Sequence, residues 1–330
     1  MSGSHWSTQK ERAVGYWNVR IMLVLFKLLP VILLRLIAFP VGFFYFLFSK
    51  TARGHSRAYL RRVNALRRES RQSAGAENQP NAKKLKSLRH FLAFALALVD
   101  KVEAWGGKAP FKRVHFCDDD IDSLISLLES GQGAVLISSH LGNMEFARAL
   151  AGMNRTGVSR EVPVNALVDI KVTAHFNRML KELNSQSATR LMSVSDLGPD
   201  TVILLVQRLA AGDLVVIAGD RTGAGGSGRI IPVSFFDEPA PLPYGPFLLA
   251  ALLDAPVYSV FALRTRDISL RSHYALHVHK SPLTFDCGRA ERNARIRELA
   301  HWFASQLQRY CQEHPYQWYN FFDFWKMPEQ

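Results

Sequence analysis

The sequence predicts an α/β protein, a mixed sheet flanked by helices, with a hydrophobic membrane-anchor helix near the N-terminus. Short apolar runs alternate with segments of helical periodicity from residue 120 onward, and 48% of the 330 residues are hydrophobic. This alternation is typical of layered α/β folds, and the hydrophobic content suffices for a sizeable core. Residues 21–48 are strongly apolar, and they predict the anchor.

The periodicity places the elements of the sheet domain in order, after a polar loop at 70–84. We expect helices at 88–105, 120–129, 144–153, 174–184, 198–211, 244–253 and 289–313. We expect strands at 134–138, 162–168, 214–219, 231–236, 256–263 and 274–280.

The apolar stretch at 21–48 is long enough to cross a bilayer core of about 30 Å. Lys27, Arg35 and two prolines interrupt it. They weaken the prediction of a spanning helix, and a re-entrant or interfacial helix in which the two basic side chains snorkel toward water is the competing interpretation. A signal peptide is disfavoured because a basic segment, not a small-residue cleavage site, follows. Both a spanning and an interfacial anchor stay open.

A basic segment follows the anchor at residues 50–71, with Glu69 as its only acid. Arg53, Arg57 and Arg61 recur every four residues, which predicts that they share a helix face. Basic charge beside an apolar anchor is typical of the cytoplasmic side of a membrane. No nucleic-acid-binding motif accompanies it, so we expect no nucleic acid partner. We therefore divide the chain into an anchor with its basic helix, 1–72, and a sheet domain, 85–330.

Charge and cysteine content bound the partners and the compartment. The formal net charge is +13, which favours an anionic partner. The three cysteines, Cys117, Cys287 and Cys311, form no C-x-x-C pair and are odd in number. A disulfide framework or a cysteine zinc site is therefore disfavoured, and a reducing, cytosol-facing compartment fits best.

A histidine and a glutamate stand five positions apart after the predicted strand 134–138: His140 and Glu145. Gly142 permits a tight turn and Asn143 is a good N-cap, so the histidine lies in a loop and the glutamate in the next helix. An imidazole backed by a carboxylate can act as a general base toward an alcohol or amine. On local grounds, a structural histidine beside an N-terminal helix acid is an equal alternative.

A second polar group, Gly219-Asp220-Arg221, ends the predicted strand 214–219, where α/β proteins place binding residues. An arginine there can clamp a phosphate or stabilise an oxyanion, and an Asp–Arg surface pair is the alternative. The following 223–228 matches G-x-G-x-x-G, but a strand-like sequence comes next instead of a helix. We therefore interpret it as a flexible loop and expect no dinucleotide.

Two blocks carry a family resemblance. Residues 140–145 read His-Leu-Gly-Asn-Met-Glu, and the segment from Asp220-Arg221 to 235–246 ends in Phe-Phe-Asp-Glu-Pro-Ala-Pro-Leu-Pro-Tyr-Gly-Pro. With the basic-tailed anchor, they resemble the lipid A late acyltransferases, the lauroyl/myristoyl transferase family, and more loosely the glycerolipid acyltransferases. Arg221 stands where many members have Gln. The family's Tyr-Arg after the third strand is missing near Lys171, and the C-terminal 317–325 also departs from the family pattern, so the chain resembles a divergent branch.

The resemblance implies a glycerolipid-acyltransferase-like sheet domain over 85–330 that moves an acyl group from a thioester to a hydroxyl of a membrane lipid or glycolipid. The donor would be acyl carrier protein. His140 would be the base and Glu145 would orient it. Substrate binding or oxyanion stabilisation would fall to Asn143, Asp220, Arg221 and Lys171. The resemblance implies no cofactor and no metal, and it implies the cytoplasmic face of a bacterial inner membrane.

Three other interpretations stay open. An esterase or thioesterase could use Ser138 or Ser139, although the chain has no G-x-S-x-G elbow. In a non-catalytic membrane-binding protein, His140 and Glu145 would be structural. A metal site could draw on His273, His277 and His279, but no further ligand is evident nearby, so plain strand histidines are favoured.

Overall fold

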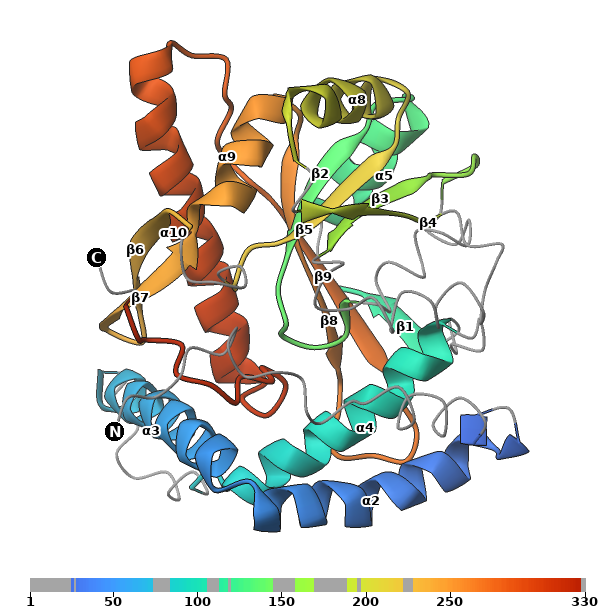
Figure 1. The fold of residues 1–330 in the computed structure, drawn as a ribbon, viewed down its shortest axis with the longest axis vertical. Coiled ribbons are helices and arrows are strands. Elements are labelled where there is room, and N and C mark those ends of the chain that lie inside the picture. The colour runs from blue at the N-terminus through green and yellow to red at the C-terminus, as the bar shows by residue number, and fades with distance from the viewer. Residues whose placement is uncertain are drawn as a thin grey trace.

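The computed structural model describes residues 25–26, 28–73, 84–105, 113–117, 120–144, 158–168, 189–194, 197–221 and 228–327. Within them the chain forms a sheet with helices on both sides (Figure 1). The helices are α2 (Val31–Phe48), α3 (Lys50–Ser73), α4 (Ser87–Trp105), α5 (Asp120–Glu129), α8 (Pro199–Ala210), α9 (Tyr244–Leu253) and α10 (Arg289–Glu313). The strands are β1 (Val114–Phe116), β2 (Ala134–Ser138), β3 (Val164–Val168), β4 (Thr189–Ser193), β5 (Leu214–Ala218), β6 (Ile230–Phe235), β7 (Glu238–Pro243), β8 (Val257–Arg264) and β9 (Tyr274–Lys280).

The main sheet has seven strands in the order β1-β9-β8-β2-β5-β3-β4. Its pairs are parallel except β8 with β9, so the predicted mixed α/β sheet is confirmed. The central strands β2 and β5 are short apolar runs buried on both faces, as parallel strands covered by helices require. β6 and β7 form a separate antiparallel hairpin.

The two faces of the sheet carry separate cores, and the alternation of side chains assigns each residue to one of them. On β2, Val135 and Ile137 join a core with α8, α9 and α10, whereas Ala134 and Leu136 join a second core with α5. β5 repeats this pattern. Successive side chains of a strand point to opposite faces, so a five-residue apolar strand serves both cores.

Most predicted elements are present, and the differences have local causes. The six predicted strands and five of the seven predicted helices occur within one or two residues of their expected bounds. The helices expected at 144–153 and 174–184 lie outside the described residues, apart from Met144. The sequence reading missed β1, β4 and β7. β7 contains three prolines, which cannot donate to a ladder and are tolerated only in an edge position such as this hairpin.

The anchor region is packed against the sheet domain. α2 lies along α4, and it is the one helix in the described part of the chain that is long and apolar enough to cross a membrane. The expectation that Arg35 snorkels is wrong. Its side chain is only 4% exposed and pairs with Asp100 and Glu103 of α4, because two buried carboxylates bind the guanidinium better than a distant water layer. Lys27 lies outside the described residues.

Candidate active site

The site lies where β2 and β5 end side by side. These strands pair in parallel with Ser138 opposite Ala218, and the Gly219 amide donates to the Ser138 carbonyl at 2.8 Å. His140 and Asp220 each stand two residues beyond that pair. The register therefore brings two side chains 80 residues apart in sequence to the same point at the carboxyl edge of the sheet.

Asp220 holds His140 by both its ring and its backbone. The His140 Nδ1 lies 2.8 Å from Asp220 Oδ1, and the His140 amide donates to Asp220 Oδ2 at 2.9 Å. The indole Nε1 of Trp318 donates to the same Oδ2 at 3.2 Å. Asp220 is 1% exposed while the imidazole is 36% exposed, so the carboxylate is the buried support and the ring faces outward.

The electrostatics of this pair suit a neutral imidazole on an ionised carboxylate. Burial lowers the pKa of His140, and the nearby Arg221 charge lowers it further against the opposing effect of Asp220. Burial alone would raise the pKa of Asp220, but the contacts with His140 and the charge of Arg221 outweigh it and lower that pKa to about 2. Nδ1–H then donates to Asp220, and Nε2 carries the lone pair that can accept a proton.

The loop that carries His140 is clamped on two sides. Gly142 has a φ of 74°, and a Cβ there would lie 2.1 Å from the Ala262 carbonyl oxygen, so only glycine fits. The Gly142 amide donates to the Gln317 carbonyl and the Asn143 amide to the Ala262 carbonyl, at 2.9 and 2.8 Å. The C-terminal segment and β8 together set the height of the histidine above the sheet.

The C-terminal segment is itself held by a buried histidine of α4. His90 Nε2 donates to the Trp318 carbonyl at 2.8 Å, and its Nδ1 lies 3.0 Å from the Ser56 hydroxyl. Burial lowers the pKa of His90 to about 4, so the ring is neutral and can keep this pair of bonds. Helices α3 and α4 thereby support the indole that contacts Asp220.

Arg221 turns away from its neighbour Asp220. Its guanidinium donates to the Tyr319 carbonyl at 3.2 Å and lies 5.3 Å from the centre of the Phe322 ring. The alternative of an Asp–Arg surface pair is therefore wrong, because Asp220 is buried and bound to His140. Arg221 remains close enough to affect the His140 pKa, which keeps a positive charge beside the imidazole.

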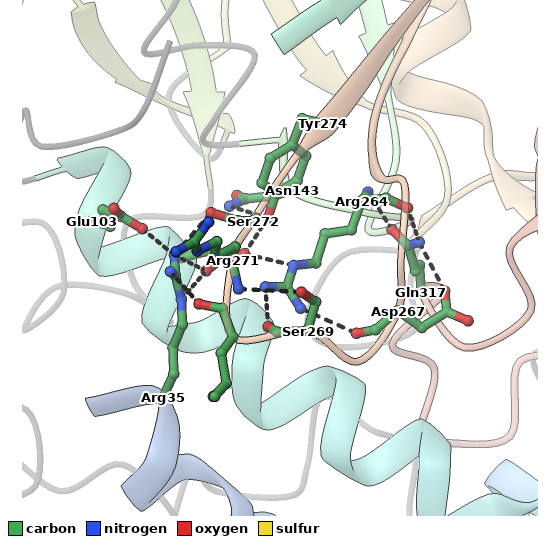
Figure 2. A network of polar contacts seen from close by, with 12 residues as sticks. Arg35, Glu103, Asn143, Arg264, Asp267, Ser269, Arg271, Ser272, Tyr274 and Gln317 are labelled. Carbon is green, nitrogen blue, oxygen red and sulfur yellow. Dashed lines mark hydrogen bonds and ion pairs between the residues drawn. The ribbon is translucent and has the colours of Figure 1, made fainter. Parts of the chain in front are cut away.

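Asn143 joins the site to a buried network of charges (Figure 2). Its side-chain amide donates to the Tyr274 hydroxyl at 3.5 Å, and that hydroxyl donates to Asp100 at 2.6 Å. Asp100 pairs with Arg35 and with Arg264, both at 2.9 Å. Gln317 binds the backbone N–H and C=O of Arg264, so the network and the clamp on the histidine loop share members.

The structure brings only some of the predicted site residues close together. His140, Asp220, Arg221 and Asn143 gather within one loop cluster, whereas Glu145 and Lys171 lie outside the described residues. Sequence reasoning missed that Asp220 contacts Nδ1 of the imidazole and that Trp318 supports it. The position of Asp220 at a strand end was the available signal; no local pattern marks a tryptophan that reaches the site from the far end of the chain.

The side chains named in the alternative interpretations have other contacts. The Ser138 hydroxyl donates to the Ile217 carbonyl, and the Ser139 hydroxyl accepts from the Leu141 amide. His279 bonds the Tyr310 hydroxyl at 2.6 Å, and the His277 ring lies 4.6 Å from the Tyr310 ring. Across the described ranges, no three His, Cys, Asp or Glu side chains are arranged to hold a metal ion.

Comparison with known proteins gives one family. The model of the bacterial lipid A biosynthesis acyltransferases matches residues 1–327, which is nearly the whole chain. Among curated proteins no match is found. The match covers the anchor region as well as the sheet domain, and it includes both strand-end loops that form the site.

Proposed function

This chain belongs to the bacterial lipid A biosynthesis acyltransferase family and is an acyltransferase, and we propose that His140 is the general base of its reaction. The proposed reaction moves a fatty acyl group from an acyl thioester, carried by acyl carrier protein, to a hydroxyl of a membrane lipid or glycolipid. The single observation that carries the assignment is the bond between His140 Nδ1 and Asp220 Oδ1. It leaves Nε2 of a partly exposed ring as the proton acceptor.

In the proposed step, Nε2 of His140 takes the proton of the acceptor hydroxyl as its oxygen attacks the thioester carbonyl carbon. The tetrahedral intermediate collapses, the carbon–sulfur bond breaks, and the imidazolium returns the proton to the leaving thiolate. Asp220 stabilises the imidazolium through Nδ1 while it exists. No acyl-enzyme is needed, because the acceptor oxygen attacks the donor directly.

The other site residues receive proposed roles from their charge and position. Arg221 adds a positive charge near the imidazole and would stabilise the oxyanion or bind an acceptor phosphate. Lys171 would bind substrate or stabilise the oxyanion. Asn143 would hold the shape of the turn. Glu145, the acid of the His-x4-Glu spacing, would support the histidine together with Asp220 or contact substrate.

The proposed partners are both acidic, which suits a chain with a formal net charge of +13. Acyl carrier protein would approach as donor and an anionic lipid as acceptor. A cytosolic carrier and a lipid acceptor meet at the cytoplasmic face of the inner membrane, and that is the proposed location. The one candidate membrane helix among the described residues supports a membrane location.

The test is acyl transfer in detergent from a labelled acyl carrier protein thioester to a total bacterial lipid extract. Wild type would run beside His140→Ala and Glu145→Ala. We expect a new labelled lipid from wild type, its mass identifying the acceptor, and a loss of rate of about 100-fold or more for His140→Ala. Near-normal transfer by a folded His140→Ala would overturn the assignment. Labelled free fatty acid without a new lipid would indicate a thioesterase.

A further inference from the structure

The outward face of α2 is apolar along the whole helix. Figure 1 shows α2 along the lower edge of the molecule, with α4 between it and the sheet. The large apolar side chains on this face are each at least 42% exposed: Ile32, Leu33, Leu36, Ile37, Val41, Phe43, Phe44, Leu47 and Phe48. A continuous apolar face of this kind marks a surface that another apolar phase covers.

The opposite face of α2 is fixed to α4 in antiparallel contact. Arg35 pairs with Asp100 near one end, and a Cβ at Gly42 would lie 3.0 Å from the Ala95 Cβ farther along. The Tyr45 ring then lies 5.1 Å from that of Phe91. Residue numbers increase along α2 while those of the contacted residues decrease along α4. The two helices are therefore antiparallel and in contact over about 15 Å.

Arg35 makes this contact hard to undo. Its guanidinium donates to Asp100, Glu103, the Ser272 hydroxyl and the Leu270 carbonyl. Figure 2 shows Arg35 with Glu103 and Ser272 in this network. Separating α2 from α4 would leave the two carboxylates without this cation and the loop after β8 without its donor. Burial of such unpaired charges is strongly unfavourable.

This packing conflicts with an upright helix. An α2 that crossed the bilayer would carry α4 and the polar loop at 265–273 to the depth of the acyl chains. Asp100 sits on α4 with its other bonds to Arg264 and Tyr274 of the sheet domain, so that domain would follow. Irregular polar backbone is not found facing lipid at that depth. The geometry points to an α2 that lies parallel to the membrane plane within one leaflet, its apolar face on the acyl chains.

The charges of α3 agree with this orientation. Four exposed cations of this helix return to one face within about 40°: Lys50, Arg57, Arg61 and Arg68. Arg53, expected on the same face, instead bonds carbonyls at the end of α2. A row of cations that starts two residues after the end of α2 can contact lipid phosphates while α2 contacts acyl chains.

The experiment measures the depth of three labels along α2. Leu33→Cys, Ile37→Cys and Phe44→Cys lie on one line of the exposed face, separated along the axis by up to about 16 Å. Each would carry a nitrobenzoxadiazole label in full-length protein bearing Cys117→Ser and Cys287→Ser, with the buried Cys311 kept as a sign of unfolding. Shallow and deep nitroxide phospholipids in phosphatidylcholine–phosphatidylglycerol vesicles would quench the labels. Ala38→Cys, 7% exposed in the contact with α4, is the matched control.

We expect the same shallow-to-deep quenching ratio at all three positions and no reaction of Ala38→Cys with a thiol reagent after vesicles are added. A ratio that changes steadily from Leu33 to Phe44 would overturn the inference, as would exposure of Ala38→Cys. If the labels are not quenched and the protein is a dimer, the inference is also overturned, because a second copy of the chain then covers this face. The quenching measurement does not depend on enzymatic activity. If the three labels lie at equal depth in a protein that transfers no acyl group, the orientation of α2 stands and only the proposed reaction is contradicted.

Discussion

Two buried carboxylates, Asp220 and Asp100, have opposite kinds of partner. Asp220 accepts from His140 and Trp318, and the ring that it holds is 36% exposed. Asp100 binds Arg35 and Arg264, both at most 4% exposed, inside a closed network.

Asp220 supports the proposed general base, whereas Asp100 is enclosed by two arginines. The His140 pKa is lowered by burial and by Arg221, which keeps a neutral base available. In the closed network, burial raises the pKa of Glu103 to about 7 despite the charge of Arg35. A carboxylate beside an open titratable ring therefore indicates catalysis more than a carboxylate beside two arginines does.

The largest effect is expected from removing the charge of Asp220. In Asp220→Asn the amide can no longer stabilise the imidazolium, and we expect kcat to fall by about 100- to 10,000-fold. The measurement is acyl transfer under saturating donor and acceptor. Asp213→Asn is the matched control, because Asp213 is 5% exposed at the opposite end of β5 and contacts Asn165 and Arg190 instead. Equal losses in the two variants would contradict the catalytic role.

A substitution in the closed network around Asp100 should lower the stability of the protein more than its rate of acyl transfer. Arg35→Met leaves Asp100 with one cation and the Leu270 carbonyl without its donor, and we expect the free energy of unfolding to fall by about 3 kcal/mol. Chemical denaturation in one detergent would measure it. Arg57→Met, on the exposed face of α3, should change stability by no more than about 0.5 kcal/mol. A native-like Arg35→Met would show that the network does not hold α2.

Removing the indole N–H that donates to Asp220 should have a smaller effect on kcat. Trp318→Phe keeps the aromatic packing but removes the Nε1 donor, and we expect kcat to fall about tenfold, the equivalent of one hydrogen bond to a charged group. Trp325→Phe removes a comparable donor that bonds the Phe235 carbonyl away from the site. If the control loses as much activity, the loss comes from packing of the aromatic cluster.

The smallest expected effect is a shift of the pH profile. Only neutral His140 can accept the proton, so kcat/KM should fall as the pH drops through its pKa, which burial and Arg221 hold below the usual value of a histidine. Arg221→Gln removes a charge that lowers this pKa, and the acid limb should therefore move to higher pH. Arg229→Gln, whose guanidinium lies over the Tyr244 ring, should leave the limb in place. An unmoved limb in Arg221→Gln would exclude His140 as the titrating group.

Local patterns predicted most of the fold. The apolar runs at β2 and β5 are long enough, and flanked clearly enough, for strand period and length to identify them. β1 and β7 were missed because a three-residue strand and a proline-rich strand lack the usual pattern. β1 pairs with the distant β9, whereas β7 pairs with the adjacent β6.

For the candidate site, too, local patterns predicted one part and contacts between distant residues decided the other. The sequence by itself determined that His140 and Asp220 each follow a strand and that Gly142 allows the turn after His140. Only the tertiary structure decided that β2 and β5 are neighbours, that Trp318 reaches Asp220, and that Arg35 is buried against α4 instead of snorkelling. Periodicity depends on residues a few positions apart, whereas strand order and burial of a charge depend on contacts between residues 65 to 98 positions apart.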